Sequence, residues 1–399
     1  MTTADLQARW QRVMLNNYGT PAMSIVSGSG TRVTDADGRT YLDALAGIAV
    51  STLGHAHPEI VAAIAAQAAT LMHSSNLAVQ PVALELAERL VAISGWEAKV
   101  FFSQDGATAN EAALKIARRR GYALVPDGGK QRIVAAAGGF HGRTMGALAV
   151  TGNPAKRDPF APFGHEVTFV PYGDAHALAA ALGPDVAAVI LEPAQGENGV
   201  VVPPANYLHE ARALTLQHGA LLIVDEVQSG IGRTGAWFAS HTAGIIPDIV
   251  TLAKGLAGGM PIGAVLVTGD AREALLPGDH GTTFGGNPVS CAAALTVLDV
   301  IHRDGLLVHV RDTGEYLRDA VHALEAPVVA RTQGMGLWFG LTLTADVAPV
   351  VERRMRELGV IVNAAKPNVI RIAPPLIITR DEIDELVAAL AIALAEVAA

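Results

Sequence analysis

Two short apolar runs near the middle of the chain each end in a charged residue. Residues 220–224 lead into Asp225, and residues 248–253 lead into Lys254. Runs of this length predict buried strands of a parallel sheet, and the carboxyl ends of such strands form the edge where ligands bind. A charged residue is rarely found there unless it is paired or takes part in chemistry. A lysine amine beside a carboxylate that can hold a pyridine nitrogen protonated is the minimal equipment of a pyridoxal phosphate enzyme.

Apolar runs alternate with helical patterns on both sides of these two residues. Between about residues 97 and 269 this alternation predicts a mainly parallel sheet covered by helices on both faces, and hence an α/β fold. The clearest helices are expected at 108–119, 175–182 and 206–218. The strands are expected at 100–102, 132–136, 167–170, 187–191, 220–224, 249–252 and 263–267.

The two ends of the chain have a different pattern. Residues 1–50 predict an amphipathic segment followed by a hairpin with its turn at 35–38, and residues 51–288 predict a large α/β domain. Residues 289–399 predict a smaller α+β domain. No flexible linker separates these parts, so we expect them to be rigidly docked. In the smaller domain, helices are expected at 289–302, 306–324 and 381–397, and strands near 337–343 and 369–372.

Composition narrows the possible classes of function. Only 17% of the 399 residues are charged while 50% are hydrophobic, which predicts buried surface beyond that of a monomer and hence an oligomer. The net charge of −9 argues against a nucleic-acid or anionic-membrane partner. Cys291 is the only cysteine, the N-terminus lacks a signal-peptide core, and no apolar stretch is long enough to span a bilayer. We therefore expect a cytoplasmic protein, and because the histidines lack ligand spacing we expect no metal.

The segment 103–115 follows a predicted strand and is suited to binding an anion. It predicts a turn into a helix that starts near Ala107, so the backbone N–H groups of Gly106 and Ala107 would face the anion. An ordinary helix capped by Asp105 is the simpler alternative.

The segment 139–144 also follows a predicted strand. Phe140 could lie flat against an aromatic cofactor, and Arg143 could hold a carboxylate in bidentate geometry. His141 is more simply interpreted as a hydrogen-bonded packing residue.

Residues 230–235 match the dinucleotide fingerprint G-x-G-x-x-G, which raises a nicotinamide-dependent dehydrogenase as an alternative. The glycines do not lead directly into a helix, and no acidic residue ends a second strand at the usual spacing. We therefore predict a loop.

Taken together, these motifs resemble the class-III, ornithine-type pyridoxal phosphate aminotransferases, and within them the acetylornithine aminotransferases. The resemblance runs from 16–19 to 371–375. It implies an aspartate-aminotransferase-like fold (fold type I) and a homodimer whose active sites lie at the subunit boundary. The most specific stretches are 54–58, 140–144, 192–197, 225–228, 252–255 and 282–288.

The resemblance implies a set of residues that bind the cofactor, pyridoxal 5'-phosphate. Lys254 would bond to it covalently and serve as base and acid, and Asp225 would face its ring nitrogen. The phosphate would be held by the backbone of Gly106 and Ala107 and by Thr283 of the other subunit. Phe140 and Val227 would pack on the two faces of the ring, and Gln228 would contact the ring hydroxyl. Glu226 is also implied as a cofactor-binding residue.

The resemblance also implies how substrates are held. Arg143 and Tyr18 would bind a substrate carboxylate, Thr282 would contact substrate, and Arg371 would bind the α-carboxylate of glutamate. Acetylornithine reacts at its terminal amine and brings no carboxylate to that place, so Glu197 would pair with Arg371 instead of leaving it unpaired. The implied reaction transfers the terminal amino group of N2-acetyl-L-ornithine to 2-oxoglutarate, reversibly, giving N-acetyl-L-glutamate 5-semialdehyde and L-glutamate for arginine biosynthesis.

Some positions depart from the family pattern. Asp105 stands where the family has a serine that donates to phosphate, and its carboxylate would repel a phosphate unless it turns away to cap the helix. Thr108 replaces a glutamate, Ala78 an aromatic residue, and Asn198 a small residue. Two alternatives stay open: a sister aminotransferase for ornithine, succinylornithine, succinyldiaminopimelate or 4-aminobutyrate, and a non-catalytic protein that keeps only the fold.

Overall fold

A seven-stranded sheet forms the centre of the molecule in the computed structural model, which describes residues 1–164 and 166–398. The strand order is β4-β10-β9-β8-β7-β5-β6, and β10 alone runs antiparallel to its neighbours. The predicted strands are all confirmed. Their bounds are β4 Ala98–Ser103, β5 Arg132–Ala136, β6 Val167–Val170, β7 Val186–Leu191, β8 Leu221–Asp225, β9 Ile249–Leu252 and β10 Gly263–Thr268.

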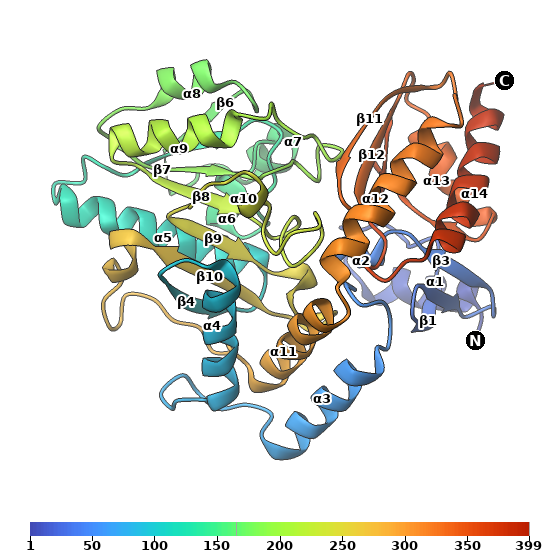
Figure 1. The fold of residues 1–399 in the computed structure, drawn as a ribbon, viewed down its shortest axis with the longest axis horizontal. Helices are drawn as coiled ribbons and strands as arrows, with labels where there is room; N and C mark the ends of the chain where they lie inside the picture. Colours follow the sequence, from blue (N-terminus) through green and yellow to red (C-terminus); the bar gives the residue numbers. More distant parts are fainter. Residues whose placement is uncertain (165, 399) are drawn as a thin grey trace.

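Helices cover both faces of this sheet, as predicted. On one face α5 (Gly106–Leu124) packs against β7, β9 and β10, while α8 (Ala175–Ala181) and α9 (Tyr207–His218) lie on the other (Figure 1). Successive residues of a strand point to opposite faces of the sheet and join different hydrophobic clusters. Ile133 packs with α5, and Val134 packs with α8 and α9. Both faces are therefore apolar, which explains why the strands read as continuous apolar runs.

The N-terminal segment is joined to the C-terminal part of the chain. The hairpin strands β2 (Arg32–Asp35) and β3 (Thr40–Asp43) follow β1 (Ile25–Ser29), and the two-residue strand β13 (Val360–Ile361) pairs in parallel with β3. Figure 1 shows this sheet beside the C-terminal helices. The pairing joins residues more than 300 positions apart, and no local pattern in the sequence predicts it.

A third sheet, with order β11-β12-β15-β14, lies in the C-terminal part of the chain. The predicted helices and strands are confirmed in this part of the chain, and β11, β13, β14 and α13 are additions. The bounds are β11 Val329–Met335, β12 Trp338–Leu343, β14 Asn363–Lys366, β15 Val369–Ile372, α11 Pro288–Arg303, α12 Leu306–His322, α13 Ala348–Glu357 and α14 Arg380–Ala398.

Helix α11 connects the large sheet to the C-terminal part and packs against α3 (Pro58–Thr70) and α4 (Pro81–Ser94). Cys291 lies on α11 and is fully buried, and burial raises the pKa of its thiol to about 12. It is a packing residue, as predicted.

The remaining elements are α1 Thr3–Val13, α2 Ala46–Ala49, α6 Met145–Ala149, α7 Pro154–Arg157, α10 Ala239–Thr242, and the 3-10 turns η1 Asp158–Phe160, η2 Lys254–Ala257 and η3 Gly269–Glu273.

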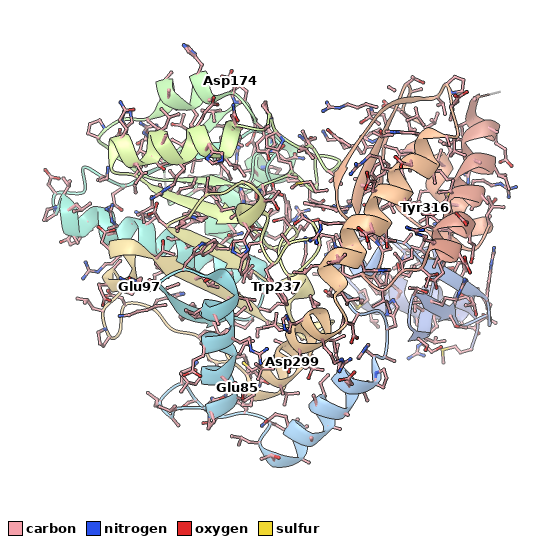
Figure 2. The ribbon with its side chains drawn as sticks, in the orientation of Figure 1. Glu85, Glu97, Asp174, Trp237, Asp299 and Tyr316 are labelled. Carbon is pink, nitrogen blue, oxygen red and sulfur yellow. The ribbon has the colours of Figure 1, made fainter. Side chains whose placement is uncertain are left out.

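Side chains fill the space between these layers (Figure 2). Trp237 is partly buried and packs against the core formed by α11, α12 and the C-terminal sheet. Acidic residues such as Glu85, Glu97 and Asp299 are exposed. No helix in residues 1–164 or 166–398 combines the length and apolar character needed to cross a bilayer.

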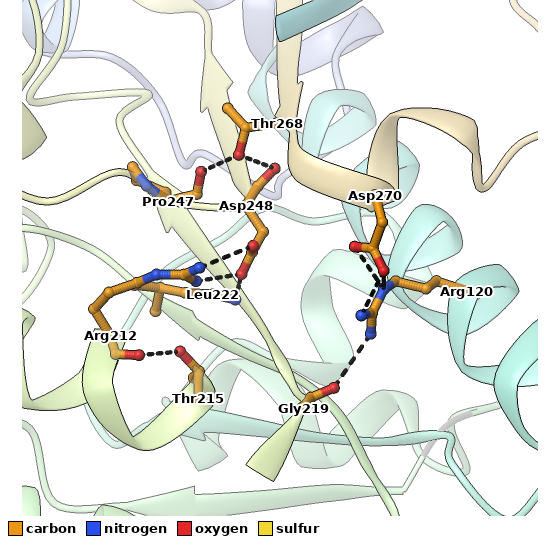
Figure 3. A network of polar contacts seen from close by, with 9 residues as sticks. All are labelled: Arg120, Arg212, Thr215, Gly219, Leu222, Pro247, Asp248, Thr268 and Asp270. Atoms are coloured by element: carbon orange, nitrogen blue, oxygen red, sulfur yellow. Dashed lines mark hydrogen bonds and ion pairs between the residues drawn. The ribbon is translucent and has the colours of Figure 1, made fainter. Parts of the chain in front are cut away.

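The amino ends of β8 and β9 are tied together by one carboxylate (Figure 3). Asp248 accepts hydrogen bonds from the guanidinium of Arg212 and, at 2.7 Å, from the backbone N–H of Leu222. On the same side of the sheet Arg120 of α5 pairs with Asp270. These contacts fix the strands and the helix at the end opposite to the residues that end β8 and follow β9.

Candidate active site

A cavity of about 390 Å³ lies at the carboxyl ends of the central strands. Its walls come from the ends of β8 and β9, the start of α5, and the loop that follows β5. We call it the main cavity. Among the residues that line it are Gly106, Ala107, Phe140, Arg143, Asp225, Val227, Gln228 and Lys254, which the sequence had singled out.

Asp225 is 4% exposed and is held by three donors. Its Oδ2 accepts from Asn110 Nδ2 at 2.7 Å and lies 2.8 Å from His141 Nδ1, and its Oδ1 accepts from the backbone N–H of Val227 at 3.0 Å. Asn110 is itself fixed, because its Oδ1 accepts from Thr251 Oγ1. The carboxylate is therefore oriented before any ligand arrives.

His141 supports the negative charge of Asp225. Burial disfavours the charged imidazole, but the hydrogen bond to Asp225 and the charges of Asp225 and Glu192 outweigh burial and raise the pKa of His141. The prediction of a hydrogen-bonded packing histidine is confirmed, with the addition that its partner is the carboxylate at the end of β8.

Lys254 follows β9 with a backbone φ of +42°, a left-handed conformation that is uncommon for a residue with a side chain and is found at functional sites. Burial lowers the pKa of its amine to about 8, although the charges of Glu197 and Asp225 act in the opposite direction. A substantial fraction of the amine is therefore neutral near physiological pH, which is the form that acts as a nucleophile or base.

The first turn of α5 offers unpaired N–H groups to the main cavity. Asp105 turns to cap this helix: its Oδ1 accepts from the backbone N–H of Thr108 at 2.7 Å and from Thr108 Oγ1 at 2.9 Å. Within the described residues, no hydrogen bond is donated by the backbone of Gly106 or Ala107. A helix N-terminus with free N–H groups fits a phosphate.

Gln228 and Val227 add to the fit for a flat phosphorylated ring. Gln228 Oε1 is buried and has no hydrogen-bond partner among the described residues, so a donor on a bound molecule would satisfy it. A Cβ on Gly106 would come within 2.8 Å of Val227 Cγ1, so only glycine lets the helix approach Val227 so closely. The residues present therefore fit pyridoxal phosphate.

Phe140 forms part of the wall of the main cavity and is fixed from behind. Its backbone N–H donates to Glu192 Oε1 at 2.9 Å, and the Arg143 guanidinium lies 5.5 Å from its ring centre. Glu192 Oε2 accepts from the backbone N–H of Gly196 at 3.3 Å, so Glu192 joins two loops of the site. Burial raises the pKa of Glu192 to about 7.

Arg371 and Glu197 form an ion pair close to the main cavity, and we call them the gate pair. Arg371 is 2% exposed, and its Nη1 donates to Glu197 Oε1 at 2.6 Å, while its Nη2 donates to Asn363 Oδ1 at 2.8 Å. Burial acts to raise the pKa of Glu197, but the charge and hydrogen bond of Arg371 lower it below its usual value. Arg371 Nε has no partner among the described residues.

The remaining sequence-predicted residues lie outside the main cavity. Glu226 is buried and accepts hydrogen bonds from Ser229, Ala239 and Ser240, so it anchors a loop and is not carried into the cofactor site. Tyr18 is 80% exposed and Thr283 is exposed. Thr282 Oγ1 accepts from the backbone N–H of Gly285 at 3.1 Å.

The glycines of 230–235 form turns, as predicted, and do not begin a helix. Gly232 and Gly235 lie so close to C-terminal residues that a Cβ would meet Leu376 and Arg311. Close packing, and not a dinucleotide, accounts for this motif. Within residues 1–164 and 166–398 no cluster of His, Cys, Asp and Glu is placed to bind a metal ion.

Sequence reasoning missed Asn110, Glu192 and Asn363. Glu192 could have been found, because it follows the apolar run 187–191 in the same way that Asp225 follows 220–224. Asn110 lies one helical turn after Gly106, and its role appears only once the helix is placed over β8 and β9.

Comparison with known proteins agrees with this geometry. The family model for aminotransferase class-III matches residues 13–394. The acetylornithine aminotransferase of Mycobacterium tuberculosis (strain ATCC 25618 / H37Rv) is 54% identical over 98% of this chain and 96% of its own length. The acetylornithine aminotransferase of Streptomyces coelicolor is 51% identical over 98% of this chain and 95% of its own length. A crystal structure of the ornithine aminotransferase from Toxoplasma gondii, with partial occupancy of PLP at its active site, superposes with a TM-score of 0.94 at 33% identity, covering 100% of this chain and 95% of that one.

The large mainly parallel sheet, the smaller C-terminal part and these similarities define a type I pyridoxal phosphate fold, as the sequence predicts. The family model spans nearly the whole chain, and the relatives match over nearly their entire lengths. The chain belongs to the class-III aminotransferases.

Proposed function

We propose that this protein is an acetylornithine aminotransferase. It transfers the terminal amino group of N2-acetyl-L-ornithine to 2-oxoglutarate, giving N-acetyl-L-glutamate 5-semialdehyde and L-glutamate in arginine biosynthesis. The observation that carries this assignment is the near full-length similarity to relatives of that name, together with a gate pair beside a cavity that holds both Lys254 and Asp225.

When bound, pyridoxal phosphate supplies an electron-withdrawing ring that stabilises the negative charge left on a substrate carbon. The Asp225 carboxylate, fixed by His141 and Asn110, would hold the ring nitrogen and favour its protonated form. The Lys254 amine would serve as the base and acid that moves the substrate proton.

The other cofactor contacts follow from the walls of the main cavity. The backbone N–H groups of Gly106 and Ala107 would hold the phosphate, and Gln228 Oε1 would accept from the ring hydroxyl. Val227 and Phe140 would pack on the two ring faces and exclude water from them.

The gate pair lets one site accept two different donors. Glutamate places an α-carboxylate beside its reacting carbon. This carboxylate pairs with Arg371 and displaces Glu197 from it. Acetylornithine has no carboxylate at that position, so Glu197 stays on Arg371 and no buried cation is left unpaired. Arg143 and Tyr18 bind the carboxylate at the far end of the substrate, and Thr282 contacts substrate.

A homodimer with shared active sites is part of the proposal. Large apolar side chains are exposed in the single chain: Leu15 is 82%, Leu77 98% and Val79 84% exposed. A second copy would cover such side chains and gain hydrophobic stabilisation. Thr283 would then reach the phosphate of the partner site. The single buried Cys291 fits a cytoplasmic enzyme, because a protein of a reducing compartment needs no disulfide.

The test is a comparison of amino donors with the purified, cofactor-loaded protein. We expect the highest kcat/KM for N2-acetylornithine, measured as glutamate formed from 2-oxoglutarate, and no turnover by the Lys254→Met variant. A kcat/KM for ornithine, succinylornithine, succinyldiaminopimelate or 4-aminobutyrate that is tenfold higher than that for N2-acetylornithine would refute the proposed amino donor. The proposed transamination chemistry would still stand. Failure of every amine, with no visible absorbance from bound cofactor, would favour a non-catalytic protein.

A further inference from the structure

A second, smaller cavity lies behind Phe140 and next to the gate pair. It has a volume of about 230 Å³, and its walls include Phe140, Lys156, Glu197, Asn198 and Lys366. We call it the side cavity. Phe140 contributes to both cavities, whereas Lys254 and Asp225 line only the main cavity. The side cavity is therefore separate from the place where the amine chemistry occurs.

Glu197 lies between cations on two sides. Its Oε1 accepts from Arg371 at 2.6 Å, and its Oε2 lies 3.8 Å from Lys156 Nζ, which also lies 5.3 Å from the centre of the Phe140 ring. At 3.8 Å the contact with Lys156 is loose, and the Lys156 amine donates no side-chain hydrogen bond within the described residues, so it is free to move closer to Glu197. Lys156 is also among the charges that lower the pKa of Glu197.

The residues on either side of Glu197 are held by hydrogen bonds. The carbonyl of Gly196 accepts from Arg371 Nη1 at 3.2 Å, and Asn198 Oδ1 accepts from Lys366 Nζ. On the other side, Asn198 Nδ2 donates to Gln195 Oε1 at 2.8 Å. A rotation of the Glu197 side chain would disturb none of these contacts, and the side cavity is the open space beside it.

The charges around the side cavity are suited to receiving this carboxylate. With no substrate present, Arg371 and Lys156 share the single carboxylate of Glu197, while Lys366 lines the same cavity and donates to Asn198. A substrate carboxylate on Arg371 would leave Glu197 beside Lys156, so the displaced charge would still have a cationic partner. Without such a partner, a partly buried carboxylate loses stabilisation each time the gate opens.

Resting on the proposed function, we propose that Lys156 is a positioning residue that receives the Glu197 carboxylate when a substrate carboxylate displaces it from Arg371. Lys156 thereby favours the state of the gate that binds glutamate and 2-oxoglutarate. It is not needed for acetylornithine, which reacts with Glu197 still on Arg371. The side cavity is the resting place of the displaced carboxylate.

The test compares the two half-reactions in the cofactor-loaded Lys156→Met variant. We expect KM for glutamate and for 2-oxoglutarate to rise about five- to tenfold with kcat nearly unchanged, the effect of losing one partly buried charge pair. KM for acetylornithine is expected to stay within twofold. Lys156→Arg should restore the dicarboxylate KM values, and Lys99→Met, which removes an exposed charge at a remote strand, should leave all of them unchanged.

Two further measurements keep the outcome independent of turnover. The Kd of glutarate for the loaded protein, measured by calorimetry, should rise by the same factor in Lys156→Met, and a crystal structure with glutarate should show Glu197 in hydrogen-bond contact with Lys156. Equal changes in KM for acetylornithine and 2-oxoglutarate, or no change in either, would overturn the proposal. Failure of acetylornithine as donor would refute the proposed function alone, because glutarate affinity still reports on Lys156.

Discussion

Replacement of Lys254 by methionine is expected to stabilise the cofactor-free protein, although it removes the central reactive group. Burial lowers the pKa of this amine from 10.5 to about 8, so the folded protein binds its proton less tightly than the unfolded chain does. A shift of this size corresponds to about 3 kcal/mol when the amine is charged in both states. Methionine has a similar length and no charge, so the folded state no longer bears this cost.

The sign of the pH dependence follows from the direction of the shift. At pH values between the pKa of Lys254 in the folded protein and its pKa in the unfolded chain, the unfolded chain binds more protons. The free energy of unfolding of the wild-type protein therefore rises with pH relative to that of the variant. The advantage of Lys254→Met should fall from about 3 kcal/mol at pH 7 to about 1 kcal/mol at pH 10. Any gain from packing the methionine is the same at both pH values and does not affect this difference.

The measurement is urea unfolding of the cofactor-free proteins at pH 7 and pH 10, at one protein concentration because the proposed dimer links stability to concentration. Lys99→Met is the matched control, because the Lys99 side chain is 60% exposed and its replacement should give no comparable pH-dependent difference. An advantage of Lys254→Met that is the same at both pH values would refute the reasoning that burial tunes this amine.

Three other substitutions test separate parts of the structure. Asp225→Asn should lower kcat/KM for acetylornithine about 100-fold, because an amide cannot stabilise a protonated ring nitrogen by charge; steady-state kinetics would show it. Asp248→Asn should lower the free energy of unfolding by about 2 kcal/mol, measured by urea unfolding, because Arg212 loses its carboxylate partner, while kcat of the folded enzyme stays unchanged. Asp105→Ser should lower the Kd of pyridoxal phosphate severalfold in fluorescence titration, because serine keeps the helix cap and removes a negative charge near the phosphate; weaker binding would contradict this placement of Asp105.

Much of the fold could be predicted from the sequence because burial on two faces leaves a local signature. The strands β7, β8 and β9 are buried at every position, and their sequences are apolar except for Thr251 in β9 and the terminal Asp225 of β8. The same runs place Asp225 and Lys254, because a charged residue directly after a buried strand must lie at the edge of the sheet. Local periodicity was also sufficient for the long C-terminal helices α11, α12 and α14.

Contacts between distant segments could not be predicted in this way. The strand β13 has only two residues, and its partner β3 lies near the other end of the chain. Lys156 reaches Glu197 from the short helix α7, and Asn363 reaches Arg371 from the neighbouring strand β14. Residue type and spacing carry no information about such pairs, so the role of Lys156 becomes visible only when the folded chain brings these segments together.

The two buried carboxylates of the site, Asp225 and Glu192, have different hydrogen-bond partners. Asp225 and Glu192 are both buried, and the charge of Asp225 is among the causes that raise the pKa of Glu192 to about 7. Asp225 has His141 and Asn110 as partners, whereas within the described part of the chain the Glu192 side chain accepts only from the backbone N–H groups of Phe140 and Gly196. Because its pKa is raised to about 7, Glu192 can take up a proton near neutral pH, and that proton would weaken its contacts with the backbone N–H groups of Phe140 and Gly196. These contacts position two loops of the site, so protonation of Glu192 is expected to loosen the loops without breaking the hydrogen bonds that His141 and Asn110 make to Asp225.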